Sequence, residues 1–285
     1  MSEFEILASG YRFVEAPRVD GNDVLYFADL LGGGVHRRDA EGCRPVLADR
    51  MWVGGVLMND DGRVVCSGRG GLVIFDPDTG EASNLLSELD GAPIIAVNDI
   101  EAAADGGLYG GTIDFVAAFE TQQPLSPGQL FHLSPDGRTT IFRDDVFASN
   151  GISYSPDRRT LYHSETSVGI WAWDVASNGM LANARIMIPV EDSDGVVVDA
   201  GGGIWVARYQ SGEVVRYRED GQADRRIPLP FPNVISLDFG GPGDRWLYVS
   251  TGGKNAAGEH MGGVIRLDVG IPGIRSAVSR FRGAA

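Results

Sequence analysis

The feature that most limits how this chain can fold is a sequence pattern that recurs six times. In each copy, a polar residue or glycine precedes alternating apolar residues, an Asp- or Gly-rich turn and a second apolar run, and a glycine-led alternating segment follows. The copies begin near residues 15, 54, 98, 150 and 194, and a divergent sixth contains ISLDFGGPGDRWLYVST. Successive starts differ by 39, 44, 52 and 44 residues, close to the ~40–45 residues of a four-stranded propeller blade. The pattern predicts an all-β fold, a six-bladed β-propeller of four-stranded blades.

We expect one propeller domain to span residues 1–285, because all-β domains of this length are common. No amphipathic stretch of a dozen residues separates the expected strands, which argues against the competing βαβ architecture. The short segment FEILA near the N-terminus is expected to pair with the C-terminal segment. That pairing would close the ring and cover both sheet edges.

The charge of the chain narrows the choice of partners. The formal net charge is −15, and such a surface repels nucleic acid phosphates and anionic lipid headgroups. Neither nucleic acid nor a membrane is an expected partner, and with no signal-like N-terminus and no apolar run of about 18 residues the expected location is the cytoplasm. We expect a monomer or a small homo-oligomer. Cys43 and Cys66 lack metal-ligand spacing and are expected to be buried free thiols.

Polar residues stand at the start of most copies of the repeat. Glu15, Gly54, Asn98, Asn150 and Asp194 share one repeat position, and four of these five carry side-chain oxygen. The innermost strands of a propeller surround the central channel, so these side chains should converge at one end of the axis. A single such residue is more simply read as a turn-capping side chain. Two carboxylates crowded together with amide oxygens instead favour a bound divalent cation.

Hard oxygen ligands determine which ion we expect. Oxygen-only ligand sets favour Ca²⁺, Mg²⁺ or Mn²⁺ over softer-ligand metals. Ca²⁺ is therefore expected first, with Mn²⁺, Mg²⁺, Zn²⁺ or Fe²⁺ as alternatives. The four histidines of the chain have no paired metal-ligand spacing and are expected to serve packing.

Several longer motifs resemble one protein family. The segments VNDIEAAADGGLYGGT, SNGISYSPDRRTLYHSET, SDGVVVDAGGGIWVARYQSGEVVRYREDG and LDFGGPGDRWLYVST are similar in content and order to the SMP-30/gluconolactonase/LRE-like family. This family includes gluconolactonase, regucalcin and luciferin-regenerating enzyme. The resemblance implies a metal-dependent lactonase acting on a small lactone. It assigns the metal to Glu15, Asn150 and Asp194, and contact with the substrate or a water to Asn98, with Asp99 in a supporting role.

Two features of the sequence bear on the substrate. Many sugar-lactone hydrolases of this family carry an Arg two residues before the Asn that aligns with Asn98, and this chain has Ala96. The absence of this Arg favours a lactone or ester less polar than a sugar lactone. The segment Ile113–Pro127, IDFVAAFETQQPLSP, makes the third repeat the longest. It is either a lid over the channel or a plain connection between blades.

The resulting hypothesis is lactone hydrolysis with Asp194 as the catalytic base. The cation would polarise the lactone carbonyl, and Asn98 would hold the substrate or the water in line. Two alternatives remain open from the sequence. One is a non-catalytic propeller that binds calcium or another ligand, and the other is a metal-assisted isomerase or dehydratase that uses the same site.

Overall fold

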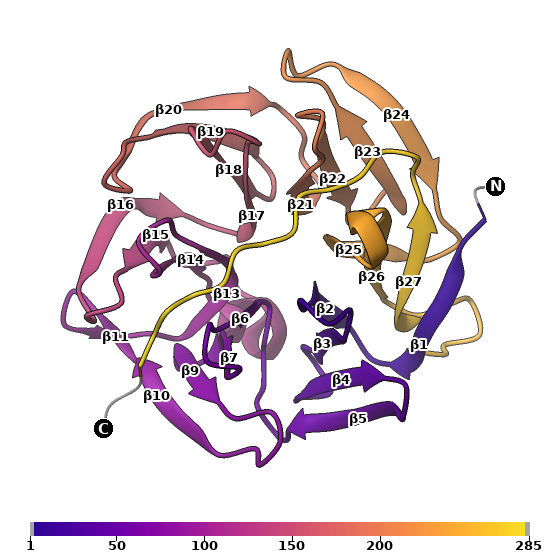
Figure 1. Cartoon of the computed structure of the whole chain (residues 1–285), viewed down its shortest axis with the longest axis horizontal. Coiled ribbons are helices and arrows are strands. Elements are labelled where there is room, and N and C mark those ends of the chain that lie inside the picture. Colours follow the sequence, from indigo (N-terminus) through magenta and orange to yellow (C-terminus); the bar gives the residue numbers. More distant parts are fainter. Residues whose placement is uncertain (1–2, 283–285) are drawn as a thin grey trace.

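The computed structural model describes residues 3–282 and consists of six antiparallel sheets around a central axis (Figure 1). The prediction of a six-bladed propeller of four-stranded blades is confirmed. From the axis outwards, the first three blades are β2 (Val14–Val19), β3 (Leu25–Asp29), β4 (Val35–Asp39) and β5 (Gly42–Leu47); β6 (Val56–Met58), β7 (Val64–Cys66), β9 (Leu72–Phe75) and β10 (Ala82–Leu86); and β13 (Ala96–Ala102), β14 (Leu108–Thr112), β15 (Gly128–Leu133) and β16 (Thr139–Val146).

The remaining blades follow the same order. They are β17 (Ser149–Tyr154), β18 (Thr160–Glu165), β19 (Gly169–Val175) and β20 (Leu181–Ile188); β21 (Ser193–Val198), β22 (Ile204–Arg208), β23 (Glu213–Tyr217) and β24 (Ala223–Pro228); and β25 (Asn233–Gly240), β26 (Trp246–Gly252), β27 (Gly262–Asp268) and β1 (Glu5–Tyr11). Strand β8 (Gly68–Arg69) extends the third sheet past β13, and β11 (Glu88–Leu89) pairs with β12 (Ala92–Pro93). The only helical segments in residues 3–282 are η1 (Val116–Thr121) and η2 (Pro242–Asp244).

The ring is closed because strands from the two ends of the chain pair in the same sheet. Strand β1 pairs antiparallel with β27 and supplies the outer strand of the sixth blade (Figure 1), as the sequence predicted. The first and last parts of the chain are therefore joined by main-chain hydrogen bonds. This arrangement covers a sheet edge that would otherwise be open to another strand.

Five of the six innermost strands share an irregularity that directs side chains towards the axis; β6 has none. Their pairing register shifts between Glu15 and Arg18 in β2, and at the equivalent places in β13, β17, β21 and β25. Side chains normally alternate between the two faces of a strand, so residues three apart would point in opposite directions. The extra residue of a bulge removes that mismatch. Each bulged strand can therefore direct two residues, three positions apart, into the channel.

Glycine at the bulge lets neighbouring innermost strands approach closely. A Cβ atom at Gly151 would collide with the backbone of Gly195 and Val196 in the next blade, and a Cβ at Gly195 would collide with the backbone at Ser236. Any larger residue would push the innermost strands apart. The narrow axis that brings the polar side chains together thus depends on these small residues.

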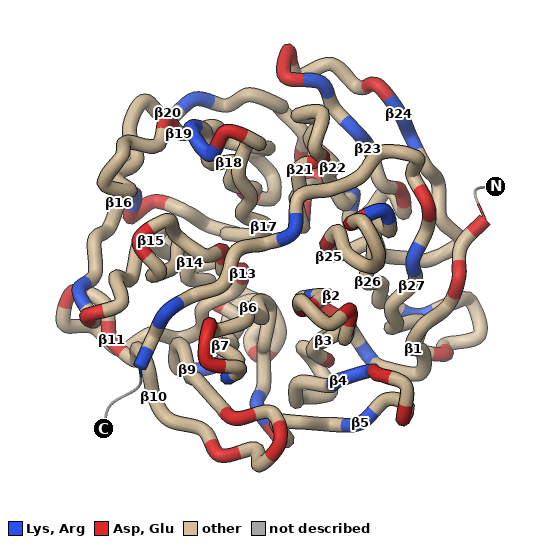
Figure 2. Tube along the Cα trace, viewed as in Figure 1, with Lys and Arg blue, Asp and Glu red and all other residues tan. Residues whose placement is uncertain are grey.

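The C-terminal strap, residues 270–282, crosses the central axis (Figure 1), at the end where the innermost strands finish; Glu15 lies near the start of β2. Its backbone contacts the turns that follow the innermost strands: Ala200 N donates to Pro272 O, Gly273 N to Asp244 O and Ser279 N to Met58 O. The charged residues of the strap are all arginines, and Arg275 and Arg282 pair with acidic turn residues (Figure 2). The strap therefore joins blades on opposite sides of the axis and spans this end of the channel.

Three further findings concern the expectations from sequence. Cys66 is buried as expected, but Cys43 is exposed, because it lies on an outer strand where its Sγ meets the Tyr11 hydroxyl at 3.1 Å. No disulfide joins these two residues. Among residues 3–282, no helix has the length and apolar character needed to cross a membrane.

The packing of the strap generates a stability prediction. Phe281 is 1% exposed and belongs to the core between the second and third blades. Phe281→Ala should lower the free energy of unfolding by about 3 kcal/mol, because it leaves a cavity in that core. Urea denaturation measures the change. Ile274→Ala, at a strap residue that is 40% exposed, is the matched control and should change stability by less than about 0.5 kcal/mol. Equal effects of the two variants would contradict the packing described.

Candidate functional site

The four oxygen-bearing residues predicted from the repeat meet in one cavity. Glu15, Asn98, Asn150 and Asp194 line a cavity of about 230 Å³ at the open end of the channel. The other two blades contribute no oxygen at this position. Gly54 must be glycine because a Cβ there would collide with Asn98 Oδ1, and the sixth blade presents the apolar Ile235.

The two carboxylates of this group are buried side by side. Glu15 is 3% exposed and Asp194 is 6% exposed. Burial raises the pKa of Glu15 well above its ordinary value, and the charges of Asp194 and Asp99 raise it further. Burial likewise raises the pKa of Asp194, with Asp99 adding to the effect. A neighbouring positive charge would relieve this repulsion.

The two amides are held in fixed orientations by a chain of hydrogen bonds. Asn98 Nδ2 donates to Ser149 O at 2.8 Å and to Asn150 Oδ1 at 2.6 Å. Asn150 Nδ2 donates to Thr166 Oγ1 at 2.6 Å, and that hydroxyl donates to Ser193 O at 2.6 Å. Both N–H groups of Asn98 are thereby occupied and its Oδ1 has no partner. Asn150 Oδ1 accepts from Asn98 and retains a second lone pair.

Several buried oxygens at this site have no hydrogen-bond partner. They are Glu15 Oε2, Asn98 Oδ1, Asp99 Oδ2 and Asp194 Oδ1. Buried polar atoms are nearly always paired, so such a group indicates a missing cation or water. Within residues 3–282, no three His, Cys, Asp or Glu side chains gather as a metal-binding group. An ion here would therefore need amide oxygen as well as carboxylate ligands, a set that suits a hard divalent cation.

A second polar layer lies deeper in the channel, three residues further along the innermost strands. Arg18 approaches Glu101 at 3.5 Å and Asp238 at 3.6 Å, and its guanidinium also bonds Ser276 of the C-terminal strap. Asp99 interacts with both layers. Burial raises its pKa to about 7 against the opposing effect of Arg18, and its charge in turn raises the pKa values of Glu15 and Asp194.

The mouth of the cavity is apolar and is covered on one side by η1. Ala118 and Phe119 of η1 line the cavity, together with Ile113 and Phe115 just before it. Asp114 starts the helical turn, because its Oδ1 accepts a hydrogen bond from Ala117 N at 2.9 Å. The segment Ile113–Pro127 thus contributes one wall of the cavity.

An ion pair and an aromatic stack hold η1 in place. Arg69 Nη1 lies 3.2 Å from Glu120 Oε1, and its guanidinium stacks over Trp52 at 4.4 Å. Trp52 in turn packs edge-on against Phe115, with ring centroids 5.9 Å apart. These contacts join the segment Ile113–Pro127 to residues of the second blade.

Sequence reasoning missed several residues of the site. Thr166 and Tyr209 line the cavity, although neither stands at a repeat start. His163 was expected only to pack, but its Nε2 forms a hydrogen bond of 2.8 Å with Ser149 Oγ, next to Asn150 in the chain. Burial lowers the pKa of His163 to about 3, and Arg143 contributes, so the ring is neutral near pH 7. The only available signal was the position of Thr166 and Tyr209 directly after the second strand of a blade.

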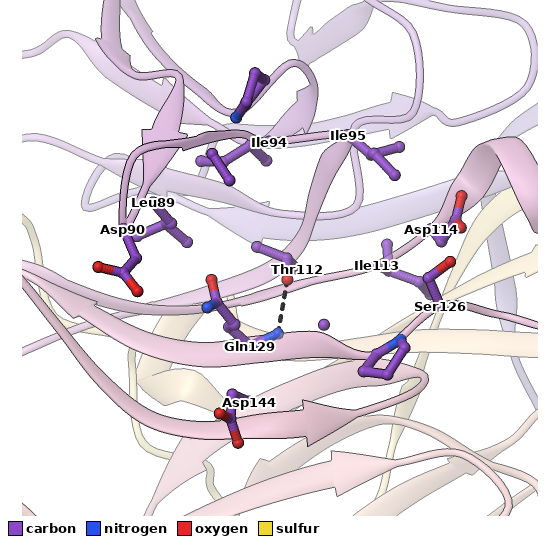
Figure 3. Close-up of a pocket in the computed structure, with 14 residues that line it drawn as sticks. Leu89, Asp90, Ile94, Ile95, Thr112, Ile113, Asp114, Ser126, Gln129 and Asp144 are labelled. Atoms are coloured by element: carbon purple, nitrogen blue, oxygen red, sulfur yellow. Dashed lines mark hydrogen bonds between the residues drawn. The ribbon is translucent and has the colours of Figure 1, made fainter.

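A second cavity lies on the outer side of the same segment (Figure 3). It measures about 290 Å³ and shares only Ile113 with the axial cavity. Its acidic residues are Asp90, Asp114 and Asp144, and Asp114 is already used to start η1. None of the predicted site residues lies there.

Fold and site together define a six-bladed propeller protein with an oxygen-lined cavity at one end of its axis. The chain belongs to the SMP-30/Gluconolactonase/LRE-like family, whose sequence profile matches residues 13–253. It is 32% identical over 277 residues to the pentonolactonase XacC of Haloferax volcanii, covering 89% of this chain and 90% of that one. It is 28% identical over 265 residues to a 6-deoxy-6-sulfogluconolactonase of Pseudomonas putida, covering 88% of each.

A solved structure agrees with these relatives. The gluconolactonase XC5397 of Xanthomonas campestris superimposes with a TM-score of 0.79 at 25% identity, covering 95% of this chain and 90% of that one. The resemblance predicted from the sequence motifs is confirmed.

The buried carboxylates generate a pH prediction for protein freed of metal by a chelator. Asp99 has a pKa of about 7 in the folded chain and about 3.8 when unfolded, so between these values only the folded state holds the proton. Its contribution to stability therefore falls as the pH rises from 4 to 7. Asp99→Asn should remove that fall and make the chelated protein more stable than wild type at pH 8 by roughly 2–4 kcal/mol.

Urea denaturation at pH 4.5 and pH 8 measures the difference. Asp90→Asn, at an exposed position outside the channel, is the control and should follow the wild-type pH profile. If the free energy of unfolding of Asp99→Asn changed with pH in parallel with wild type, the raised pKa of a buried carboxyl group at this position would be contradicted.

Proposed function

We propose that the axial cavity hydrolyses a lactone with a divalent cation held by Glu15, Asn150 and Asp194. The chain is a lactonase, in line with its family and with the pentonolactonase and sulfogluconolactonase to which it is similar. The observation that carries the metal-dependent form of the proposal is the group of unpartnered buried oxygens beside two like-charged carboxylates. Such a group is costly without a cation.

A bound cation would supply Lewis-acid polarisation of the lactone carbonyl, and we expect Ca²⁺ first because all the candidate ligands are oxygens. Glu15 and Asp194 would provide the charge that binds it, and Asn150 a neutral oxygen. Thr166 fixes the rotation of Asn150 by accepting from its Nδ2. The ligand oxygen of Asn150 therefore does not depend on a free side-chain rotation.

Asp194 is the proposed catalytic base. As water attacks the carbonyl carbon, a carbon–oxygen bond forms, and Asp194 takes the proton that the water gives up. When the ring carbon–oxygen bond breaks, the same proton passes to the leaving alkoxide. Burial and Asp99 raise the pKa of Asp194 in the metal-free site, and a cation bound beside it would favour the ionised form that can accept the proton.

Asn98 is the proposed positioning group for the water or the substrate. Both hydrogen bonds of its Nδ2 go to the protein, while its Oδ1 has no partner. The free oxygen can accept a hydrogen bond from the attacking water and fix its direction. Positioning of this kind contributes to rate because the reacting atoms begin in line.

The substrate is proposed to be less polar than a sugar lactone. Ala96 stands where many sugar-lactone hydrolases of the family have an Arg, and it is fully buried. No guanidinium can reach substrate hydroxyls from this position.

Metal dependence is tested by chelation. Dialysis against a chelator should abolish lactone hydrolysis, measured by pH release, and added Ca²⁺ should restore it. An ion at 100 times its dissociation constant should stabilise the fold by about 2.7 kcal/mol, seen as a rise in the thermal midpoint. Glu15→Gln should weaken that rise. Full activity in chelated protein that elemental analysis shows to be metal-free would contradict the proposal.

The role of Asp194 is tested by two substitutions. Asp194→Asn keeps an oxygen but removes the base and the charge, so kcat should fall about 10²- to 10⁴-fold while circular dichroism shows an intact fold. Asp194→Ala should also lose the ion-induced rise in thermal midpoint. Asp90→Asn again serves as the control with unchanged turnover. Retention of wild-type kcat in Asp194→Asn would rule out its catalytic assignment.

A further inference from the structure

We propose that the favoured substrates are lactones bearing a short hydrocarbon substituent, and that Phe115, just before η1, and Phe119 within η1 form the wall that receives it. This inference rests on the proposed function, because it concerns the same cavity. It adds the chemical class of the substrate and the residues that select it.

The cavity has a polar floor and apolar walls. The floor consists of Glu15, Asn98, Asn150 and Asp194. The side chains above it are mostly apolar: Phe13, Leu30, Ile113, Phe115, Ala118, Phe119 and Ala148. Phe119 lies at the lip and is 40% exposed, with its ring centroid 5.2 Å from that of Phe115. An exposed aromatic side chain next to an oxygen-lined site is an apolar contact surface for whatever occupies the site.

The walls offer few hydrogen bonds. Thr166 already accepts from Asn150 and donates to Ser193 O, so its hydroxyl has no proton left to donate. Tyr209 contributes the other wall hydroxyl. Lys and Arg are absent from the described residues that line this cavity. A ring hydroxyl that faces the apolar side chains, rather than the polar floor or Tyr209, would thus be buried against carbon at a cost of roughly tenfold or more in binding.

The arginine on the neighbouring strand makes other contacts. Arg69 pairs with Ala96 across β8 and β13, but its guanidinium stacks over Trp52 and pairs with Glu120. Ala96 itself packs in one apolar cluster with Leu30, Trp52, Ile113 and Phe115. Apolar side chains therefore fill the space from which a cationic group would reach the substrate.

These contacts predict a dependence on chain length. Each methylene group buried against the aromatic wall should improve kcat/KM by about fourfold until the substituent reaches solvent. A hydroxyl group at the same ring carbon should reduce it. The preference for longer hydrocarbon substituents should be lost when Phe119 is replaced by alanine.

The test compares γ-butyrolactone, γ-hexalactone and γ-octalactone with L-arabinono-1,4-lactone, which has the same ring size, in the Ca²⁺-loaded full chain. We expect kcat/KM to be at least tenfold higher for γ-octalactone than for the arabinonolactone. In Phe119→Ala, the ratio of kcat/KM for γ-octalactone to that for γ-butyrolactone should fall about fivefold or more. Ile186→Ala, at an apolar residue that is 48% exposed on the outer strand β20, is the control and should leave the ratio unchanged.

The outcomes separate this inference from the proposed function. Equal or faster hydrolysis of the arabinonolactone, or an unchanged ratio in Phe119→Ala, overturns the inference while hydrolysis itself stands. If no lactone is hydrolysed, the proposed function fails, and calorimetric titration with 4-hydroxyoctanoate and with L-arabinonate then decides the inference alone. Tighter binding of the hydroxyoctanoate, weakened in Phe119→Ala, supports it, and equal or tighter binding of the arabinonate overturns it.

Discussion

Repulsion among buried carboxylates is the constraint on which the centre of this molecule depends. Five carboxyl groups, those of Glu15, Asp99, Glu101, Asp194 and Asp238, share the channel with one guanidinium, that of Arg18. The deeper layer is relieved by Arg18, which lies within 3.6 Å of Glu101 and Asp238. The outer layer has no such partner within the described chain. The propeller thus concentrates uncompensated negative charge at the one end of the axis that stays open.

The geometry of the blades explains how a sheet structure delivers so many polar groups to one line. A bulge in the innermost strand allows positions three apart to face the channel, and small residues at the bulge allow the blades to crowd together. The polar floor is built on these strands, whereas Ile113, Phe115, Ala118 and Phe119 of the apolar walls belong to an insertion between two strands of the third blade. In the proposed function, catalysis and much of the substrate selection are therefore carried by separate parts of the fold, and the insertion can change without disturbing the floor.

Much of this arrangement could be predicted from the sequence, because the repeat defines both the blades and their equivalent positions. Glu15, Asn98, Asn150 and Asp194 were found in this way, since equivalence in a ring means proximity at its axis. Arg18 could not be found by the same reasoning, because the bulge that turns it inward has no distinct sequence signal. The roles of Thr166 and Phe119 also escaped prediction. They depend on how a loop and a neighbouring blade fold over the mouth, and no local pattern specifies such contacts.

The C-terminal strap bears on how a substrate enters the axial cavity and how the product leaves it. A cavity on the strap side is lined by Arg18 and by Ser276 of the strap, which are bonded to each other. It shares no lining residue with the axial cavity, so the axial cavity is a blind pocket rather than a tunnel. Whatever enters past η1 must leave by the same opening. The lactone substrate and the hydroxy-acid product therefore use the same opening of the cavity. The carboxylates at the base of the cavity repel the anionic product towards that opening.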